Sequence, residues 1–114
     1  MSWKIDGFNI TLTRGDAFPA RFPLYLDGEE YALQDGDSVR FAVRDQDGES
    51  VLIEKDISDD YLLDLESEDT KDLDFGTYRY DVQITFAESG KPLTYIPDTP
   101  TGKARLKLTW EADI

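Results

Sequence analysis

Three Asp-Gly pairs divide the first half of the chain into short runs of alternating apolar and polar residues. The pairs are Asp27-Gly28, Asp35-Gly36 and Asp47-Gly48. Asp and Gly tolerate the positive φ angles of tight hairpin turns, and alternation places apolar side chains on one face of a strand. The same alternation returns at residues 78–86 and 106–110. The pattern predicts an all-β fold built from hairpins. One hairpin should join residues 38–44 to residues 51–55, and another should join the strand that begins at residue 76 to residues 93–96 through Ser89-Gly90.

The number of turn signals indicates a sandwich rather than a barrel. We expect roughly seven to nine strands in one domain spanning residues 1–114. One short helical turn is expected at residues 67–73, capped by Ser67. A single sheet of this size would leave one apolar face exposed to water, so the strands should pack antiparallel in two layers.

Alternation also predicts which side chains form the core. In the strand expected at residues 38–44, Ala42 should point outward with the arginines on either side of it. Residues 18–26 alternate as well, but Pro19 and Pro23 cannot donate ladder hydrogen bonds, which favours a protected edge strand. The expected core consists of Phe22, Leu24, Val39, Phe41, Val43, Ile53, Leu65, Leu73, Tyr78, Tyr80, Val82, Ile84, Leu106 and Leu108.

Composition argues against several classes of function. The sequence contains no Cys and no His, which excludes disulfides and removes the commonest metal ligand and general base. We therefore expect no enzymatic activity, no bound metal and no cofactor. The net charge of −13 opposes binding to nucleic acid and to anionic membranes, so neither is an expected partner. No apolar segment resembles a signal peptide or a membrane span, and synthesis in a cytoplasm is expected.

Two short motifs resemble functional sites but have simpler interpretations. Arg14-Gly15-Asp16 matches an adhesion tripeptide, yet so short a motif often arises by chance, and Gly15 is interpreted as a kink between two segments of an edge strand. Asp45-x-Asp47-Gly48 begins like a calcium loop but lacks the third carboxylate and the closing Glu, so a hairpin turn explains it. Residues 59–74 contain eight acidic groups and one Lys, at spacings that favour a solvated connection over a cation site.

The last expected strand has basic residues on its outer face. Lys103, Arg105 and Lys107 alternate there with buried leucines. In so acidic a chain, we expect them to face carboxylates on the neighbouring strand, such as Asp81. The alternative is a docking patch for an acidic partner.

The spacing Leu73-x-x-Gly76-x-Tyr78 is a more specific signal. In immunoglobulin-type sandwiches, a Tyr near the start of strand F donates its hydroxyl to backbone a few residues upstream and locks the corner before that strand. Gly76 would supply the turn and Tyr78 the hydroxyl; the alternative is a Tyr that only packs on the core. The Cys and Trp of antibody domains have no counterparts here, so we predict a cysteine-free, immunoglobulin-like β-sandwich. Its structural residues would be Gly76 and Tyr78 at the corner, and Gly15, Gly28, Gly36 and Gly48 in turns.

Three segments carry a resemblance to a known family. They are ITLTRGD at residues 10–16, LQDGDSVRFAV at 33–43 and EDTKDLDFGTYRYDVQ at 68–83. Together with the last strand, these segments are similar to immunoglobulin-like modules of phages and prophages of Gram-positive bacteria, such as the N-terminal domain of baseplate upper proteins. The resemblance implies a non-catalytic virion protein of the tail, baseplate or capsid surface that binds other virion proteins. Family members continue into a trimerising helix, so a stand-alone module is expected here.

Two further kinds of partner are compatible with the same scaffold. Incompletely covered strand edges suit contacts with sister subunits in a homo-oligomer. A carbohydrate-binding or adhesion module of a bacterial surface protein would instead use exposed aromatic side chains. The candidates for such a surface are Trp3, Tyr25, Tyr61 and Tyr95.

Overall fold

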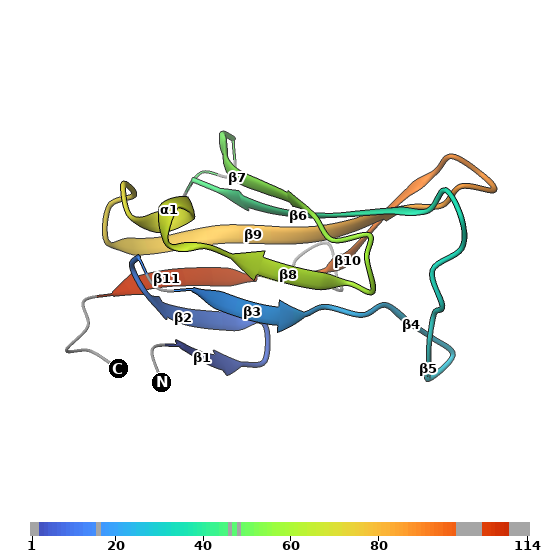
Figure 1. Cartoon of the computed structure of the whole chain (residues 1–114), viewed down its shortest axis with the longest axis horizontal. Helices are drawn as coiled ribbons and strands as arrows, with labels where there is room; N and C mark the ends of the chain where they lie inside the picture. The colour runs from blue at the N-terminus through green and yellow to red at the C-terminus, as the bar shows by residue number, and fades with distance from the viewer. Residues whose placement is uncertain (1–2, 16, 46, 48, 98–103, 110–114) are drawn as a thin grey trace.

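The computed structural model describes residues 3–15, 17–45, 47, 49–97 and 104–109, and these residues form mainly β-strands (Figure 1). The first strands are β1 (Trp3–Asp6), β2 (Asn9–Thr13), β3 (Phe18–Arg21), β4 (Tyr25–Leu26) and β5 (Glu29–Glu30). They are followed by β6 (Ser38–Arg44), β7 (Val51–Asp56), β8 (Leu62–Leu65), β9 (Gly76–Thr85), β10 (Pro92–Ile96) and β11 (Arg105–Thr109). One helical turn, α1 (Ser67–Thr70), precedes β9. The predicted all-β class is confirmed.

Seven of the strands form one large sheet. Six of them lie in the order β1-β2-β11-β9-β6-β7, and β10 pairs with β9 beside this path. Strand β9 is the longest, with ten residues; β11 pairs with its first half and β10 with its second half. The hairpins β6–β7 and β9–β10 confirm the pairing that alternation and turn signals predicted.

One pairing contradicts the purely antiparallel prediction. Strands β2 and β11 run parallel, with Ile10 opposite Leu106 and Leu12 opposite Leu108. A parallel pair joins distant segments, so no local turn signal marks it in the sequence. Strand β1, which the analysis of alternation did not reveal, forms a hairpin with β2.

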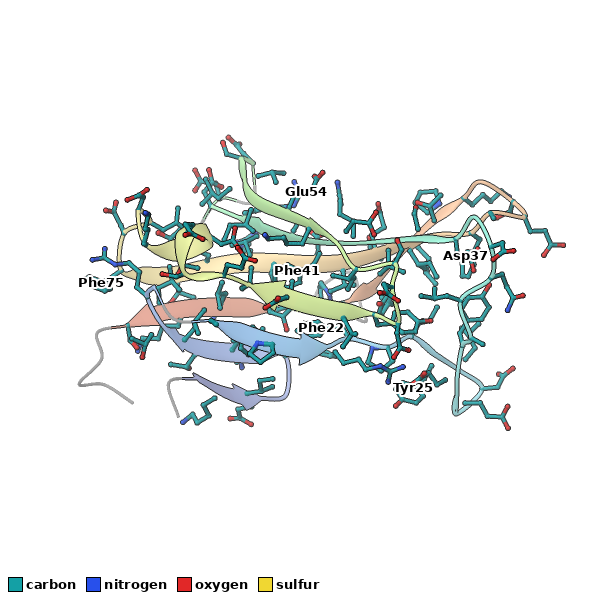
Figure 2. All side chains as sticks on the ribbon, in the orientation of Figure 1. Phe22, Tyr25, Asp37, Phe41, Glu54 and Phe75 are labelled. Carbon is teal, nitrogen blue, oxygen red and sulfur yellow. The ribbon has the colours of Figure 1, made fainter. Side chains whose placement is uncertain are left out.

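The ladder of β3 and β8 forms a second, smaller layer over the large sheet (Figure 1). Phe22, directly after β3, stacks on Phe41 of β6 with ring centroids 5.7 Å apart. Tyr80 of β9 completes this aromatic cluster, 5.4 Å from Phe41. Figure 2 shows Phe22 and Phe41 inside the body of the molecule. All predicted core residues are buried except Leu73, which is half-buried at the margin of the core.

Three local predictions are corrected by the structure. The strand expected over residues 18–26 ends at Arg21 before Pro23, and Leu26 is exposed instead of following the buried Leu24. Ala42 lies on the outer face as predicted, although its small side chain is fully buried there.

The other two corrections concern the segments before β3 and β9. Gly15 is not a kink within one edge strand, because it joins β2 of the large sheet to β3 of the second layer. The cap of α1 is Glu66 rather than Ser67. The Glu66 backbone N–H donates to Asp69 Oδ2 over 2.8 Å, so the carboxylate three residues later secures this end of the turn.

Candidate functional site

The expected corner residues and turn glycines have structural contacts. The Tyr78 hydroxyl donates to the Asp74 carbonyl over 2.6 Å, and Gly76 enters β9 with a φ of 143°. Gly15, Gly28 and Gly36 have φ angles of 87°, 82° and 88°, whereas Gly48 lies outside the described residues. Gly36 also has no room for a side chain, since a Cβ atom there would lie 2.9 Å from the Ala87 Cβ.

The adhesion-like tripeptide is tied to the body of the protein. Arg14 Nη1 donates to the Leu73 carbonyl over 2.9 Å, and its guanidinium lies 4.0 Å from the centre of the Phe75 ring. The Gly15 N–H donates to Thr70 Oγ1 over 2.9 Å, and Asp16 is outside the described residues. Arg14 therefore secures the turn between the layers and is not a free recognition side chain.

The calcium-like segment closes the β6–β7 hairpin. Asp45 Oδ1 accepts the Glu49 N–H over 3.0 Å, and the Asp45 N–H donates to the Ser50 carbonyl over 3.0 Å. In the ranges that the structure describes, no three acidic residues are grouped so that they could hold a metal ion. Nor do those ranges contain a helix with the length and apolar character needed to cross a membrane.

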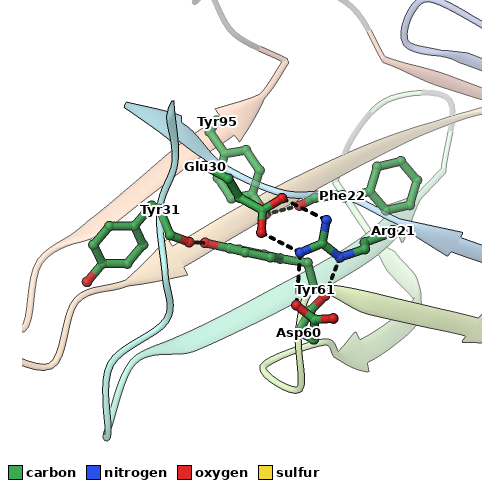
Figure 3. A network of polar contacts seen from close by, with 7 residues as sticks. All are labelled: Arg21, Phe22, Glu30, Tyr31, Asp60, Tyr61 and Tyr95. Carbon is green, nitrogen blue, oxygen red and sulfur yellow. Dashed lines mark hydrogen bonds and ion pairs between the residues drawn. The ribbon is translucent and has the colours of Figure 1, made fainter. Parts of the chain in front are cut away.

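Strands β4 and β5 form a short arm at one end of the molecule, and Arg21 holds this arm to the body (Figure 3). Arg21 Nη1 and Nη2 donate to the two carboxylate oxygens of Glu30 over 2.7 and 2.5 Å. Arg21 also donates to the side chain and the carbonyl of Asp60, over 2.8 and 3.0 Å. The hydrogen bonds from Arg21 lower the pKa of Glu30.

Tyrosine hydroxyls add to this arm junction. Tyr61 donates to the Tyr31 carbonyl over 2.6 Å, and Tyr95 donates to the Phe22 carbonyl over 2.5 Å (Figure 3). The Tyr31 hydroxyl donates to Asp37 Oδ2 over 2.7 Å, which raises the pKa of Tyr31 to about 12. An open hollow of about 760 Å³ lies next to Tyr31 and Asp37, between the residue 34–37 turn and the β9–β10 turn.

These contacts overturn part of the predicted sugar-binding surface. Tyr61 is 1% exposed and Tyr95 is half-buried, because both rings turn inward to reach backbone carbonyls. The side chain of Trp3 lies outside the described part. Tyr25 alone of the four candidates is shown to be exposed, at 59%. The described residues therefore do not present the expected group of exposed rings.

The tip of the arm is the first candidate surface. Tyr25 and Leu26 are 59% and 42% exposed on β4, and Figure 2 shows Tyr25 on the outside of the arm. Asp27 and Gly28, with φ angles of 53° and 82°, form the two-residue turn that their sequence predicts. The arm thus presents two exposed apolar side chains, adjacent in the sequence, on a backbone that is fixed to the body.

The outer face of the large sheet is the second candidate surface. Asp81 was expected to face Arg105 and Lys107, but it pairs with Arg44 over 2.8 Å and with Arg40 over 3.8 Å. The reason is the register: β11 pairs with β9 only as far as Arg79, so Asp81 lies beyond its end. Lys103 is outside the described residues.

Comparison of the chain with family models, curated proteins and solved structures gives no match. The interpretation of the arm tip and of the arginine-rich outer face therefore depends on the geometry of this chain alone. The sequence pattern indicated Tyr25, Arg44 and Arg105 as outward-facing residues but did not indicate Leu26 or Arg79. Leu26 is exposed because it lies at the tip of the β4–β5 arm, and sheet register brings the arginines together; neither has a local sequence signal.

Proposed function

We propose that this protein is a non-catalytic structural module of a phage or prophage virion. It acts in the tail, the baseplate or the capsid surface, through contacts with other virion proteins. The resemblance of three sequence segments to phage modules supports the class of particle. The arm tip supports the mode of action.

An immunoglobulin-like arrangement of the sandwich is part of this proposal. The strand order β11-β9-β6-β7, opposed by the β3–β8 ladder, supports this arrangement, in which β9 would take the place of strand F. The hydrogen bond from Tyr78 to the Asp74 carbonyl, at the entry to β9, is the contact expected at that corner.

The observation that carries the proposed function is the pre-organised arm. Tyr25 is a large side chain with few rotatable bonds, and such residues dominate many protein interfaces. The Arg21–Glu30 pair and the Tyr61 hydrogen bond hold the backbone of the arm in place before any partner binds. A fixed backbone reduces the entropy lost on binding. The arm is therefore suited to docking on another protein.

Co-expression with the products of flanking genes tests this proposal. We expect a stable complex with a tail, baseplate or capsid protein, measured by size-exclusion chromatography and calorimetry. Tyr25→Ser/Leu26→Ser should weaken that complex about tenfold or more, because two apolar contacts are lost. Val51→Ser/Leu52→Ser is the matched control, since it alters two adjacent residues that are 43% and 40% exposed on β7.

Two results would overturn the proposal. One is that no flanking gene encodes a virion protein. The other is a complex whose affinity is equal for the arm variant and the β7 control variant.

A further inference from the structure

Three arginines lie side by side on the outer face of the large sheet. Arg105 of β11 is opposite Arg79 of β9, and Arg79 is opposite Arg44 of β6. Neighbouring strands are separated by about 4.8 Å, and like charges directly opposite each other destabilise a sheet. Within the described part of the chain, Arg44 has a carboxylate partner in Asp81, whereas Arg79 and Arg105 form no ion pair. The row of three arginines therefore carries more positive charge than its carboxylate partner neutralises.

The excess of positive charge extends over the whole outer face. Lys107 follows Arg105 on β11 and is opposite Thr11, which in turn is opposite Lys4 of β1. By this register, the strands of the face carry six basic residues, Lys4, Arg40, Arg44, Arg79, Arg105 and Lys107, and four acidic ones, Asp6, Glu54, Asp56 and Asp81. The complete chain has 12 basic and 25 acidic residues, so the outer face inverts the overall charge balance. We call Lys4, Arg79, Arg105 and Lys107 the basic face.

The segment that runs from the turn before β8 through α1 is acidic, with eight carboxylates and one Lys in residues 59–74. Asp64 alternates with the buried Leu63 and Leu65 on β8 and therefore points away from the core, on the side opposite the basic face. Glu68 of α1 and Asp72 just after it are exposed as well. In the described ranges, these three carboxylates form no ion pair. We call Asp64, Glu68 and Asp72 the acidic face.

We propose that the basic face binds the acidic face of a second copy of this chain. The two faces are complementary in charge, and Arg–carboxylate pairs can form two parallel hydrogen bonds each. The broad side of the molecule, 45 by 26 Å, is large enough for the roughly 800 Å² that each partner buries in a standard interface. Repulsion between the net charges is screened beyond about 10 Å at 0.1 M salt, whereas paired groups in contact are closer than that.

The geometry of this contact determines what it can build. Because two different faces meet, the contact is heterologous, so it repeats from copy to copy and produces a ring or a filament. The inference rests on the proposed structural function, since it names one partner of the module, but it uses a different surface from the arm. The two ideas can therefore fail separately.

A reciprocal charge exchange tests the contact by sedimentation velocity in about 0.1 M salt. The basic-face variant is Arg79→Glu/Arg105→Glu, and the acidic-face variant is Asp64→Lys/Glu68→Lys. We expect the wild-type chain to self-associate and each variant alone to associate about 100-fold more weakly or worse, since like charges then meet. An equal mixture of the two variants should associate again, because each supplies the charge that the other requires.

Matched controls separate this contact from general charge effects and from the arm. Lys91→Glu changes the net charge half as much as the basic-face variant does, but at an exposed position beside the β9–β10 turn, and should not alter self-association. Tyr25→Ser/Leu26→Ser should also leave it unchanged. Circular dichroism checks folding, and Arg79→Gln/Arg105→Gln replaces the charge reversal if that variant does not fold.

Three outcomes would overturn the inference. The wild-type chain could remain monomeric up to about 1 mM, far above the concentration at which a specific contact of this size forms. The basic-face variant could associate as strongly as the wild type, or the mixture of variants could remain monomeric. If the basic face binds an acidic peptide while the chain stays monomeric, the inference is overturned as in the first outcome.

Discussion

Arg21 and Arg79 each directly precede an aromatic residue of the same cluster, but the charged groups around them differ. The rings of Phe22 and Tyr80, which follow them in the sequence, lie 6.1 Å apart. Arg21, on the second layer, is held by two carboxylates. Arg79, on the large sheet, lies between two other arginines.

The difference shows that an arginine can stabilise the fold through ion pairs at one position and form no ion pair within the described residues at another. The charge of Arg21 is neutralised within the chain, where it connects β3, β5 and the turn before β8. The charge of Arg79 has no such partner in the described residues, so it remains available for the contact with a second copy proposed above.

Phe41→Ala should weaken both regions together. Phe41 is fully buried, and its ring centre lies 5.7 Å from that of Phe22 and 5.4 Å from that of Tyr80. Loss of a buried ring costs about 3–5 kcal/mol of the free energy of unfolding, measured by urea titration. Phe8→Ala, at a position that is 36% exposed, is the control and should cost far less. Similar costs for the two variants would show that the cluster does not join the layers.

Removal of single hydroxyls should have smaller effects that separate the two regions. Tyr78→Phe removes the hydrogen bond to the Asp74 carbonyl and should cost about 1 kcal/mol, or up to about 3 if that carbonyl is left unsatisfied. Tyr61→Phe frees the Tyr31 carbonyl at the arm junction. Amide hydrogen exchange at residues 25–31 should rise for Tyr61→Phe and not for Tyr78→Phe. An unchanged urea midpoint in Tyr78→Phe would mean that this ring only packs.

Mild acid should loosen the arm and leave the arginine row unaffected. Hydrogen bonds from Arg21 lower the pKa of Glu30 below its ordinary value of 4.5. A lowered pKa means that the contribution to stability is complete above the ordinary value and is lost as the pH falls through the folded-state pKa. NMR of amide exchange between pH 6 and pH 3 should therefore show opening of β4 and β5 below about pH 4.5. If amide exchange in β9 and β11 rose as much as in β4 and β5 over the same pH range, the contrast between the arm and the arginine row would be contradicted.

Neutralising the two arginines should have the smallest effects, and these should differ in sign. Arg79→Gln removes like-charge repulsion across the sheet and should raise the free energy of unfolding by about 0.2–1 kcal/mol. Arg21→Gln breaks the bonds to Glu30 and Asp60 and should lower the melting temperature. Calorimetry of both variants at one salt concentration measures the difference. A comparable loss of stability in both would make Arg79 a structural residue.

Local patterns predicted a large part of this fold. Alternation and turn residues located the β6–β7 and β9–β10 hairpins and 13 of the 21 residues of the buried core cluster, because both signals act between neighbours in the chain. Core residues such as Ile10, Phe18 and Leu63 were not predicted. The parallel pairing of β2 with β11 depends on packing between distant segments, and no short-range spacing encodes it.

The candidate surfaces were less predictable for the same reason. The hydroxyl contact of Tyr78 lies four residues away and could be read from spacing. Tyr61 is buried because it reaches a carbonyl 30 residues away. The arginine row exists only through the register of three strands, so its members could not be grouped from the sequence.

The shared edge of β9 has a consequence for the order in which the chain can assemble. The hairpins β6–β7 and β9–β10 close over short loops and can form while the chain is still being synthesised. Strand β11 must be complete before it can fill the space between β2 and β9, so both of those edges stay open until residues 105–109 have emerged from the ribosome. Open edges favour pairing with other chains. The last step of folding is therefore also the step that protects the newly made protein from aggregation.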